Sequence, residues 1–224
     1  MRVGAPLYPV KHFMLKILPL EIRVWLYLPP MKYLFAFTLF VCCQSLQAET
    51  IVFDMSAFGI KFGTMTVTRE KEHDSTELYT LHAKGYLKIL WMERNDETKH
   101  TVRFQNGKLL SSVYTQIETQ KIKKWTNVSF DGKKYVVDSY RGKRTFTEAP
   151  VFSILSLYFN SAKNIQRIFY EAESDFATVK HPDANTVEIK TSDGNRSVYK
   201  YVNDMLQEME FHISIATVYM RRRG

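Results

Sequence analysis

Apolar and polar residues alternate with a period of two along much of the chain, and this pattern constrains the fold more than any other feature. On either side of Glu188, for example, stand the apolar residues Val187 and Ile189. The same alternation runs through the last segment, where the apolar positions are Met209, Phe211, Ile213, Ile215 and Tyr219. Because successive side chains of a strand point to opposite faces of a sheet, the pattern predicts half-buried β-strands.

Tight-turn dipeptides separate the strand-like segments at short intervals. Asn-Gly and Asp-Gly supply the positive φ angles that a tight hairpin needs. The clear pairs are Asn106-Gly107, Asp131-Gly132 and Asp193-Gly194, with Arg141-Gly142 and Asn203-Asp204 as weaker members of the set. They predict an antiparallel meander of roughly nine to eleven strands. A sheet of that size curls, so the expected fold class is mainly all-β, a curled antiparallel meander forming a half-barrel or incomplete barrel.

One segment departs from this alternation. Over residues 151–159 the apolar residues recur at helical spacing, and Pro150 precedes them as it often precedes a helix. The segment predicts one short helix of about two turns. It is apolar on most sides, so we expect it to pack against the sheet and to cover the open side of the curl.

The N-terminal residues have the pattern of a targeting sequence. From Met31 onward, Lys32 precedes an apolar run that ends at Cys43, and Ala48 offers a small residue for cleavage. This order is typical of a secretory signal peptide over residues 31–48, because the run is shorter than the roughly 20 residues of a membrane helix. Residues 1–30 are interpreted as a mis-assigned extension before the true start at Met31, the alternative being an extension that anchors the protein. We expect a periplasmic or secreted protein with a single antiparallel β domain over residues 49–224.

The two cysteines, Cys42 and Cys43, both lie in the expected signal peptide. A lipoprotein is the alternative interpretation, but lipidation needs a small residue before the modified cysteine, and Val41 precedes Cys42. Cleavage after Ala48 leaves a mature chain without cysteine, which excludes disulfides, thiol catalysis and thiolate metal sites.

The sequence lacks the common catalytic patterns, namely a zinc-protease helix, a phosphate loop, a dinucleotide-binding glycine pattern and a nucleophile elbow. His73 has nearby carboxylates, which are Glu70, Glu72, Asp74 and Glu77. Their setting between two strands is typical of a solvated hairpin loop, so we predict no metal, no cofactor and no catalytic residue. An enzyme stays a third hypothesis, because carboxylates far apart in sequence can converge in space.

A basic stretch with interleaved aromatic residues covers residues 121–144. Its cations are Lys121, Lys123, Lys124, Lys133, Lys134, Arg141, Lys143 and Arg144. Such a surface suits a membrane surface or an envelope protein, whereas the simpler interpretation is that exposed lysines keep sheet edges from pairing with other chains. The formal charge of +8 includes Arg221, Arg222 and Arg223 at the chain end, so it is weak evidence for nucleic acid, which is not an expected partner.

Aromatic residues are spread over many of the expected strands. Most should fill the core, but a curled sheet can also enclose a cavity for a lipid or another apolar ligand. The candidate residues that line or close such a cavity are Trp91, Phe152, Leu155, Phe159 and Phe211.

Several short stretches also carry a family resemblance, and they are residues 62–67, 106–107, 130–133, 156–159, 165–169, 193–195 and 199–203. Together they resemble an exported family of Bacteroidetes-type Gram-negative bacteria that is catalogued as a domain of unknown function. The chain departs from the family pattern at Asn160-Ser161 and at Asn203-Asp204. The resemblance implies a curved antiparallel sheet with a helix, similar in outline to periplasmic half-barrel carriers of lipids or lipoproteins, and it implies no reaction.

Two hypotheses for the function follow. The first is an exported non-enzymatic binding protein that holds a lipid or other apolar ligand in its curled sheet. The alternative is a cell-envelope structural or interaction module that acts through the basic strand surface.

Overall fold

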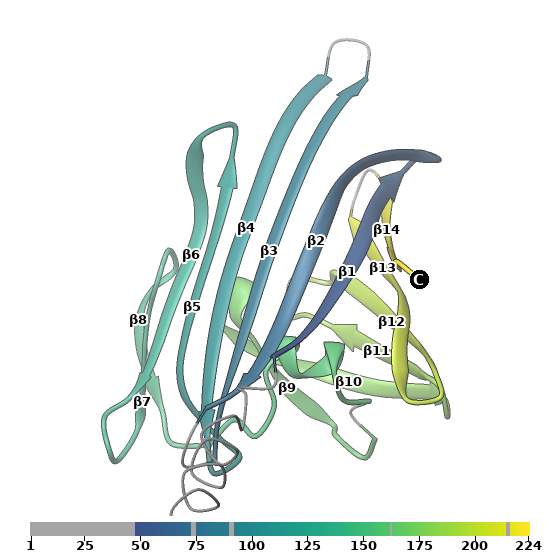
Figure 1. Ribbon diagram of the computed structural model, residues 1–224. Coiled ribbons are helices and arrows are strands. Elements are labelled where there is room, and N and C mark those ends of the chain that lie inside the picture. The colour runs from purple at the N-terminus through teal and green to yellow at the C-terminus, as the bar shows by residue number, and fades with distance from the viewer. Residues whose placement is uncertain (1–47, 73–74, 90–91, 162, 214–215) are drawn as a thin grey trace, which may run out of the picture. The chain divides into compact units, whose positions relative to one another are not determined.

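An antiparallel sheet of 14 strands is the framework of the protein in the computed structural model, which describes residues 48–72, 75–89, 92–161, 163–213 and 216–224 (Figure 1). The first strands along the chain are β1 (Ala48–Ala57), β2 (Ile60–Lys71), β3 (Thr76–Ile89), β4 (Met92–Gln105), β5 (Lys108–Glu118), β6 (Lys121–Phe130), β7 (Tyr135–Ser139) and β8 (Gly142–Phe146). The remaining strands are β9 (Arg167–Tyr170), β10 (Asp175–Asp183), β11 (Thr186–Lys190), β12 (Arg196–Val202), β13 (Met205–Ile213) and β14 (Ala216–Arg222).

The sheet is a meander in which β1 joins two runs of hairpins. β1 pairs with β2 on one side and with β14 on the other, where Phe53 lies opposite Arg222. The order is therefore β8 through β1 and then β14 through β9. The expected mainly all-β class with a curled antiparallel meander is confirmed. The expected strand number was too low, partly because the alternating segment from Met209 to Tyr219 is divided between β13 and β14.

Four of the five turn dipeptides lie between two paired antiparallel strands, and at the fifth, Arg141-Gly142, the glycine is already the first residue of β8. At Asn106-Gly107 and at Asn203-Asp204 both residues have positive φ, between 51° and 72°, as a two-residue hairpin turn requires. The second turn has no glycine, because the short polar side chains of Asn and Asp tolerate the left-handed conformation. Asp131-Gly132 and Asp193-Gly194 lie in longer loops, between β6 and β7 and between β11 and β12.

Side chains connect the two edge strands, β8 and β9, which are the ends of the sheet order. The ring of Phe146 on β8 lies 5.5 Å from that of Phe169 on β9 and 5.3 Å from that of Phe176 on β10. Arg144 forms an ion pair with Asp175 at 3.2 Å. The sheet thus curls until its edges touch through a seam of side chains, without edge-to-edge ladder hydrogen bonds among the described residues.

A short 3₁₀ helix, η3 (Ile154–Tyr158), replaces the longer helix expected over residues 151–159. At the start of the helix, the Ser153 side chain accepts a hydrogen bond from the Leu155 N–H. At its end, the Phe159 N–H donates a hydrogen bond to the Ser156 carbonyl. All five residues are buried, and the Tyr158 ring contacts that of Phe53 at 5.8 Å. The helix packs against the sheet as predicted. It is shorter because residues 151–153 are not helical, and the helix begins only after Ser153.

One end of the sheet forms a rim, which we define as the hairpins β1–β2, β3–β4, β5–β6 and β13–β14 (Figure 1). Register places them together, since Gly63 pairs with Gly85, Asp96 with Glu118, and Ala57 with Val218. At the paired glycines the strands approach closely, and the Phe62 ring covers Gly85, where an added Cβ would lie 2.8 Å from the ring. The rim exposes the large apolar residues Phe58, Ile60, Tyr86 and Ile122.

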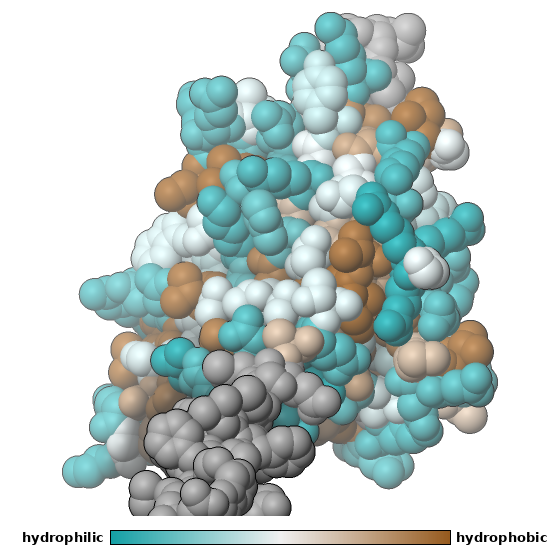
Figure 2. Space-filling model, viewed as in Figure 1, coloured by the Kyte–Doolittle hydropathy of each residue, from teal (hydrophilic) through white to brown (hydrophobic). Residues whose placement is uncertain are grey.

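Polar side chains cover most of the face shown in Figure 2, with apolar residues in separate small patches. Among the described residues, no helix is both long and apolar enough to cross a membrane. The predicted extension over residues 1–30 and all but the last residue of the predicted signal peptide, 31–48, lie outside the described residues. Ala48 begins β1.

Candidate functional site

Two adjoining cavities lie on the concave side of the curled sheet. The inner cavity has a volume of about 310 Å³ and is bordered by strands of both halves of the sheet and by the segment that holds η3 and η4 (Glu171–Glu173). The rim cavity has a volume of about 210 Å³ and is bordered by Phe58, Phe62, Leu87 and Val218 near the rim hairpins. Both are lined by Met55, Thr98, Gln116, Phe211 and Met220, so the two cavities lie side by side.

The rim cavity is lined mainly by apolar side chains, although Asp96, Thr98 and Gln116 also border it. The inner cavity has more polar walls, where His100, Tyr170, Tyr199 and Glu173 are found. An apolar cavity with a few polar groups at one end is the common form of a small-molecule site.

Of the predicted cavity residues, Phe211 borders both cavities. Leu155 is fully buried in the core, and Phe152 and Phe159 pack against that core instead of lining either cavity. The short 3₁₀ turn is the reason, because it directs Ile154 and Tyr158 toward the inner cavity in their place. Trp91 lies outside the described residues.

The predicted basic surface is largely neutralised by acidic partners. Lys123 pairs with Glu118, Lys143 with Asp138 and Arg144 with Asp175. Lys124 and Arg141 both turn toward Glu173. Lys133 and Lys134 lie in the β6–β7 loop, at the opposite end of β6 from Lys121. The structure therefore does not gather all eight cations into one patch.

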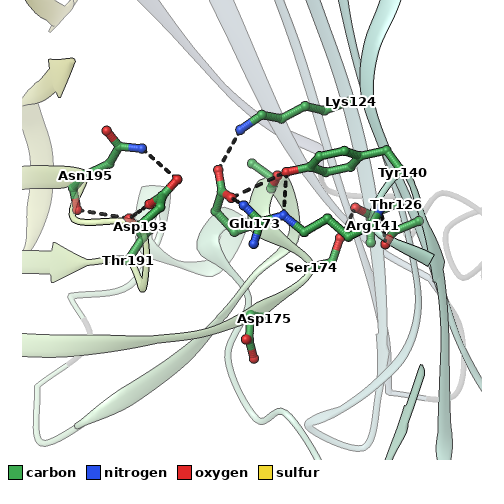
Figure 3. A network of polar contacts seen from close by, with 12 residues as sticks. Lys124, Thr126, Tyr140, Arg141, Glu173, Ser174, Asp175, Thr191, Asp193 and Asn195 are labelled. Carbon is green, nitrogen blue, oxygen red and sulfur yellow. Dashed lines mark hydrogen bonds and ion pairs between the residues drawn. The ribbon is translucent and has the colours of Figure 1, made fainter. Parts of the chain in front are cut away.

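Glu173 is the centre of a polar clasp across the seam (Figure 3). It is 4% exposed, and Lys124 donates to it at 2.6 Å, while Arg141 and Tyr140 donate to its other oxygen. Close by, the Thr126 hydroxyl donates to the Glu171 carbonyl at 2.8 Å. These contacts join β6 and the β7–β8 turn to η4, which belongs to the other half of the sheet.

A second buried acid, Glu171, does not line the inner cavity itself but stands in the chain between Tyr170 and Ala172, which do. Its side chain is fully buried, and His100 Nε2 lies 3.6 Å from Glu171 Oε1. Neither carboxyl oxygen has a hydrogen-bond partner among the described residues. Buried polar groups are nearly always satisfied, so Glu171 is an exception that calls for an explanation.

A serine, a histidine and a glutamate thus converge in this region, as they do in hydrolytic triads. The Ser112 hydroxyl lies 3.2 Å from His100 Nε2, which is the same nitrogen that faces Glu171. A triad needs the acid and the nucleophile on opposite nitrogens of the imidazole. The arrangement therefore lacks the geometry of a proton relay.

Tyr199 supplies a further unmatched group to the inner cavity. Its side chain is fully buried and its hydroxyl has no hydrogen-bond partner among the described residues. Burial raises the pKa of Tyr199 well above its ordinary value, so the hydroxyl keeps its proton at any physiological pH. Nearby Tyr201 differs, because its hydroxyl donates to the Leu157 carbonyl at 2.7 Å.

A comparison of variants at Tyr199 and Tyr201 tests whether the Tyr199 hydroxyl lacks a hydrogen bond. We expect Tyr199→Phe to leave the free energy of unfolding unchanged within about 0.5 kcal/mol, or to raise it slightly, because no bond within the protein is lost. Tyr201→Phe should cost about 1–2 kcal/mol, since it leaves a buried carbonyl without its donor. Urea denaturation of both variants measures the difference, and equal losses would contradict the assignment.

Sequence reasoning missed His100, Glu171 and Tyr199. Two acids within a stretch of four residues, 171–174, are typical of a solvated loop, and no local signal indicates their burial. The predicted absence of a metal site stays a prediction, although no cluster suited to a metal occurs among the described residues. Glu72 accepts a hydrogen bond from Arg103 and Glu77 one from Tyr79, and His73 and Asp74 lie outside the described part.

Comparison with known proteins gives a family and a similar fold. A family model described as Domain of unknown function (DUF6134) matches residues 53–223. A solved structure titled as a crystal structure of a beta-barrel-like protein of domain of unknown function DUF1849, from Brucella abortus, is similar with a TM-score of 0.55 and 13% identity. The match covers 80% of this chain and 96% of that chain, and at this identity it shows the fold alone. No curated protein matches the chain.

Proposed function

We propose that this chain, which belongs to the family described as Domain of unknown function (DUF6134), is an exported non-enzymatic binding protein that holds a lipid or another apolar ligand inside its curled sheet. The observation that carries the proposal is the unfilled interior, where cavities of about 310 and 210 Å³ adjoin. Protein cores are otherwise close-packed, and apolar cavities of a few hundred Å³ are the usual ligand sites.

Two further observations support the proposal. The signal-peptide pattern over residues 31–48 favours export, and so does the resemblance of the sequence to an exported family. The shared nitrogen at His100 favours a binding role for this group, because the Ser112–His100–Glu171 arrangement lacks relay geometry. The alternative, an envelope module acting through the basic strand surface, has less support because most of those cations are paired.

Native mass spectrometry with organic extraction tests the proposal on protein purified gently from a bacterial periplasm. We expect a stoichiometric lipid or other apolar adduct. A mass that stays clean after incubation with envelope lipids would contradict the proposal.

A matched pair of variants on β4 ties such an adduct to the cavity. Thr98 borders both cavities, so Thr98→Trp should fill their junction and abolish the adduct. Thr101 is exposed on the same strand, so Thr101→Trp should leave the adduct in place.

The rim provides the route by which an apolar ligand would enter. Phe58 borders the rim cavity and is also 60% exposed at the β1–β2 turn, next to Ile60, which is 51% exposed. A ligand that passes from a lipid bilayer into the rim cavity would first contact these exposed apolar side chains. We therefore propose that the β1–β2 hairpin contacts the surface of a lipid bilayer.

The double variant Phe58→Ser/Ile60→Ser should weaken vesicle binding about tenfold, because two exposed apolar side chains no longer enter the bilayer. The control is Val202→Ser/Met205→Ser, which changes two residues of similar exposure, 55% and 50%, at the opposite end of the sheet. Sedimentation with phospholipid vesicles measures both. Equal losses in the two double variants would contradict a specific role for the rim.

A further inference from the structure

Four tyrosines border the inner cavity, and they are Tyr114, Tyr158, Tyr170 and Tyr199. Burial raises the pKa of all four hydroxyls above the ordinary value, so each keeps its proton at physiological pH. A protonated tyrosine hydroxyl can donate one hydrogen bond. The walls of the inner cavity therefore carry several uncharged donors.

Three of these hydroxyls have a poor acceptor or none. The Tyr199 hydroxyl has no hydrogen-bond partner among the described residues, although its side chain is fully buried. The Tyr158 hydroxyl lies 3.7 Å from the sulfur of Met65, and a thioether is a weak acceptor. The Tyr114 hydroxyl lies 3.4 Å from Gln116 Oε1, which is long for a hydrogen bond between two oxygens. Because a buried donor without a good acceptor is costly, a ligand that supplies an acceptor here gains affinity.

The charged groups at this cavity favour the same kind of ligand. Glu173 is the one acid among the described residues that border it, and its two oxygens already accept hydrogen bonds, one from Lys124 and the other from Arg141. Lys124 and Arg196 border the same cavity, where Arg196 is paired with Glu188. An ammonium group of a ligand would therefore lie near these cations, and the acid that borders the cavity is already engaged.

We infer that the ligand is amphipathic and places an oxygen acceptor, a carbonyl or a carboxylate, within reach of the Tyr199 hydroxyl in the inner cavity, with its apolar part toward the rim cavity. This inference rests on the proposed function, because it specifies the ligand of the same cavities. The rim cavity suits the apolar part because its lining is mainly apolar. The arrangement selects against ligands whose polar end is an ammonium, which can donate but cannot accept.

Three probes with unbranched carbon chains of the same length test the inference, namely methyl nonyl ketone, undecanoate and undecylamine. Each is titrated against the complex of the purified protein with the neutral apolar dye N-phenyl-1-naphthylamine, whose fluorescence reports occupancy of the cavities. We expect the ketone and undecanoate to displace the dye at concentrations about tenfold lower than undecylamine, which corresponds to roughly 1.4 kcal/mol of discrimination.

A pair of tyrosine variants links this preference to the inner cavity. Tyr199→Phe should weaken the binding of methyl nonyl ketone about fivefold, because one hydrogen bond to the carbonyl is lost, and should leave the affinities of the dye and of undecylamine unchanged. Tyr201→Phe is the control, since Tyr201 borders neither cavity and its hydroxyl is bonded to Leu157. It should leave the ranking of the three probes intact.

Two failures of this experiment are distinguishable. Displacement by undecylamine at concentrations as low as those of the ketone, or a ranking that Tyr199→Phe does not alter, would overturn the inference and leave the apolar cavity proposal standing. If neither the dye nor any probe binds, the proposed function fails and the inference fails with it.

Discussion

Leu155→Ala should lower the free energy of unfolding by about 3 kcal/mol, one of the largest effects of a single substitution in this protein. Leu155 is completely buried in η3 and belongs to the hydrophobic core. Truncation removes buried apolar surface and leaves a hole that the surrounding sheet fills only in part. Urea denaturation followed by circular dichroism measures the loss.

Val151→Ala is the control for Leu155→Ala, because Val151 precedes η3 and is 57% exposed. It should cost less than about 0.5 kcal/mol, as most exposed substitutions do. Leu155→Ala should also leave probe binding at the cavity nearly unchanged wherever the protein is folded, since Leu155 borders neither cavity. A stability loss no greater than that of Val151→Ala would show that η3 is not part of the core.

Much of the fold could be predicted from the sequence because its signals are local. The Asn106-Gly107 turn joins residues that pair directly, Gln105 with Lys108, and the alternation on either side assigns each side chain to a face. In a meander, strands that follow one another in the sequence also pair in the sheet. The turn positions and the alternation of apolar and polar residues therefore suffice to predict the all-β fold class and the curl of the sheet.

The closing contacts of the fold could not be predicted in this way. Nothing near Phe53 or Arg222 indicates that the first and last strands pair, since that contact depends on how many strands the whole meander contains. The helix was predicted too long because apolar spacing cannot distinguish a 3₁₀ turn from an α-helix, and only packing inside the curl decides it.

The candidate site was predicted less well than the fold, for the same physical reason. Its polar groups come from β4, η4 and β12, and each residue alone resembles an ordinary strand or loop residue. Glu171 and Glu173 are buried because the two halves of the sheet meet at η4, a property of the curl and not of the local sequence. Of the predicted cavity residues within the described part, Phe211 alone borders the cavities.

The clasp at Glu173 gives the second large effect, and we expect Glu173→Ala to cost about 2–3 kcal/mol. Removing one partner of a buried ion pair typically costs about 3–5 kcal/mol, because it leaves the other charge without compensation. The value expected here is lower because Lys124 and Arg141 are 27% and 42% exposed and can turn partly toward water. Guanidinium denaturation would mask ionic effects, so urea is the denaturant of choice.

Glu148→Ala separates this clasp from an ordinary surface pair. Glu148 also binds an arginine, Arg167 at 2.9 Å, but the two side chains are 54% and 56% exposed, so its loss should cost about 0–0.5 kcal/mol. Glu173→Ala should also speed hydrogen exchange at the amides of β8 and β10, because the clasp holds the two edges of the curled sheet together. If exchange quickens evenly over the whole sheet, or if both glutamate variants lose the same stability, the seam is held by its aromatic contacts at Phe146 and Glu173 has no special part in closing it.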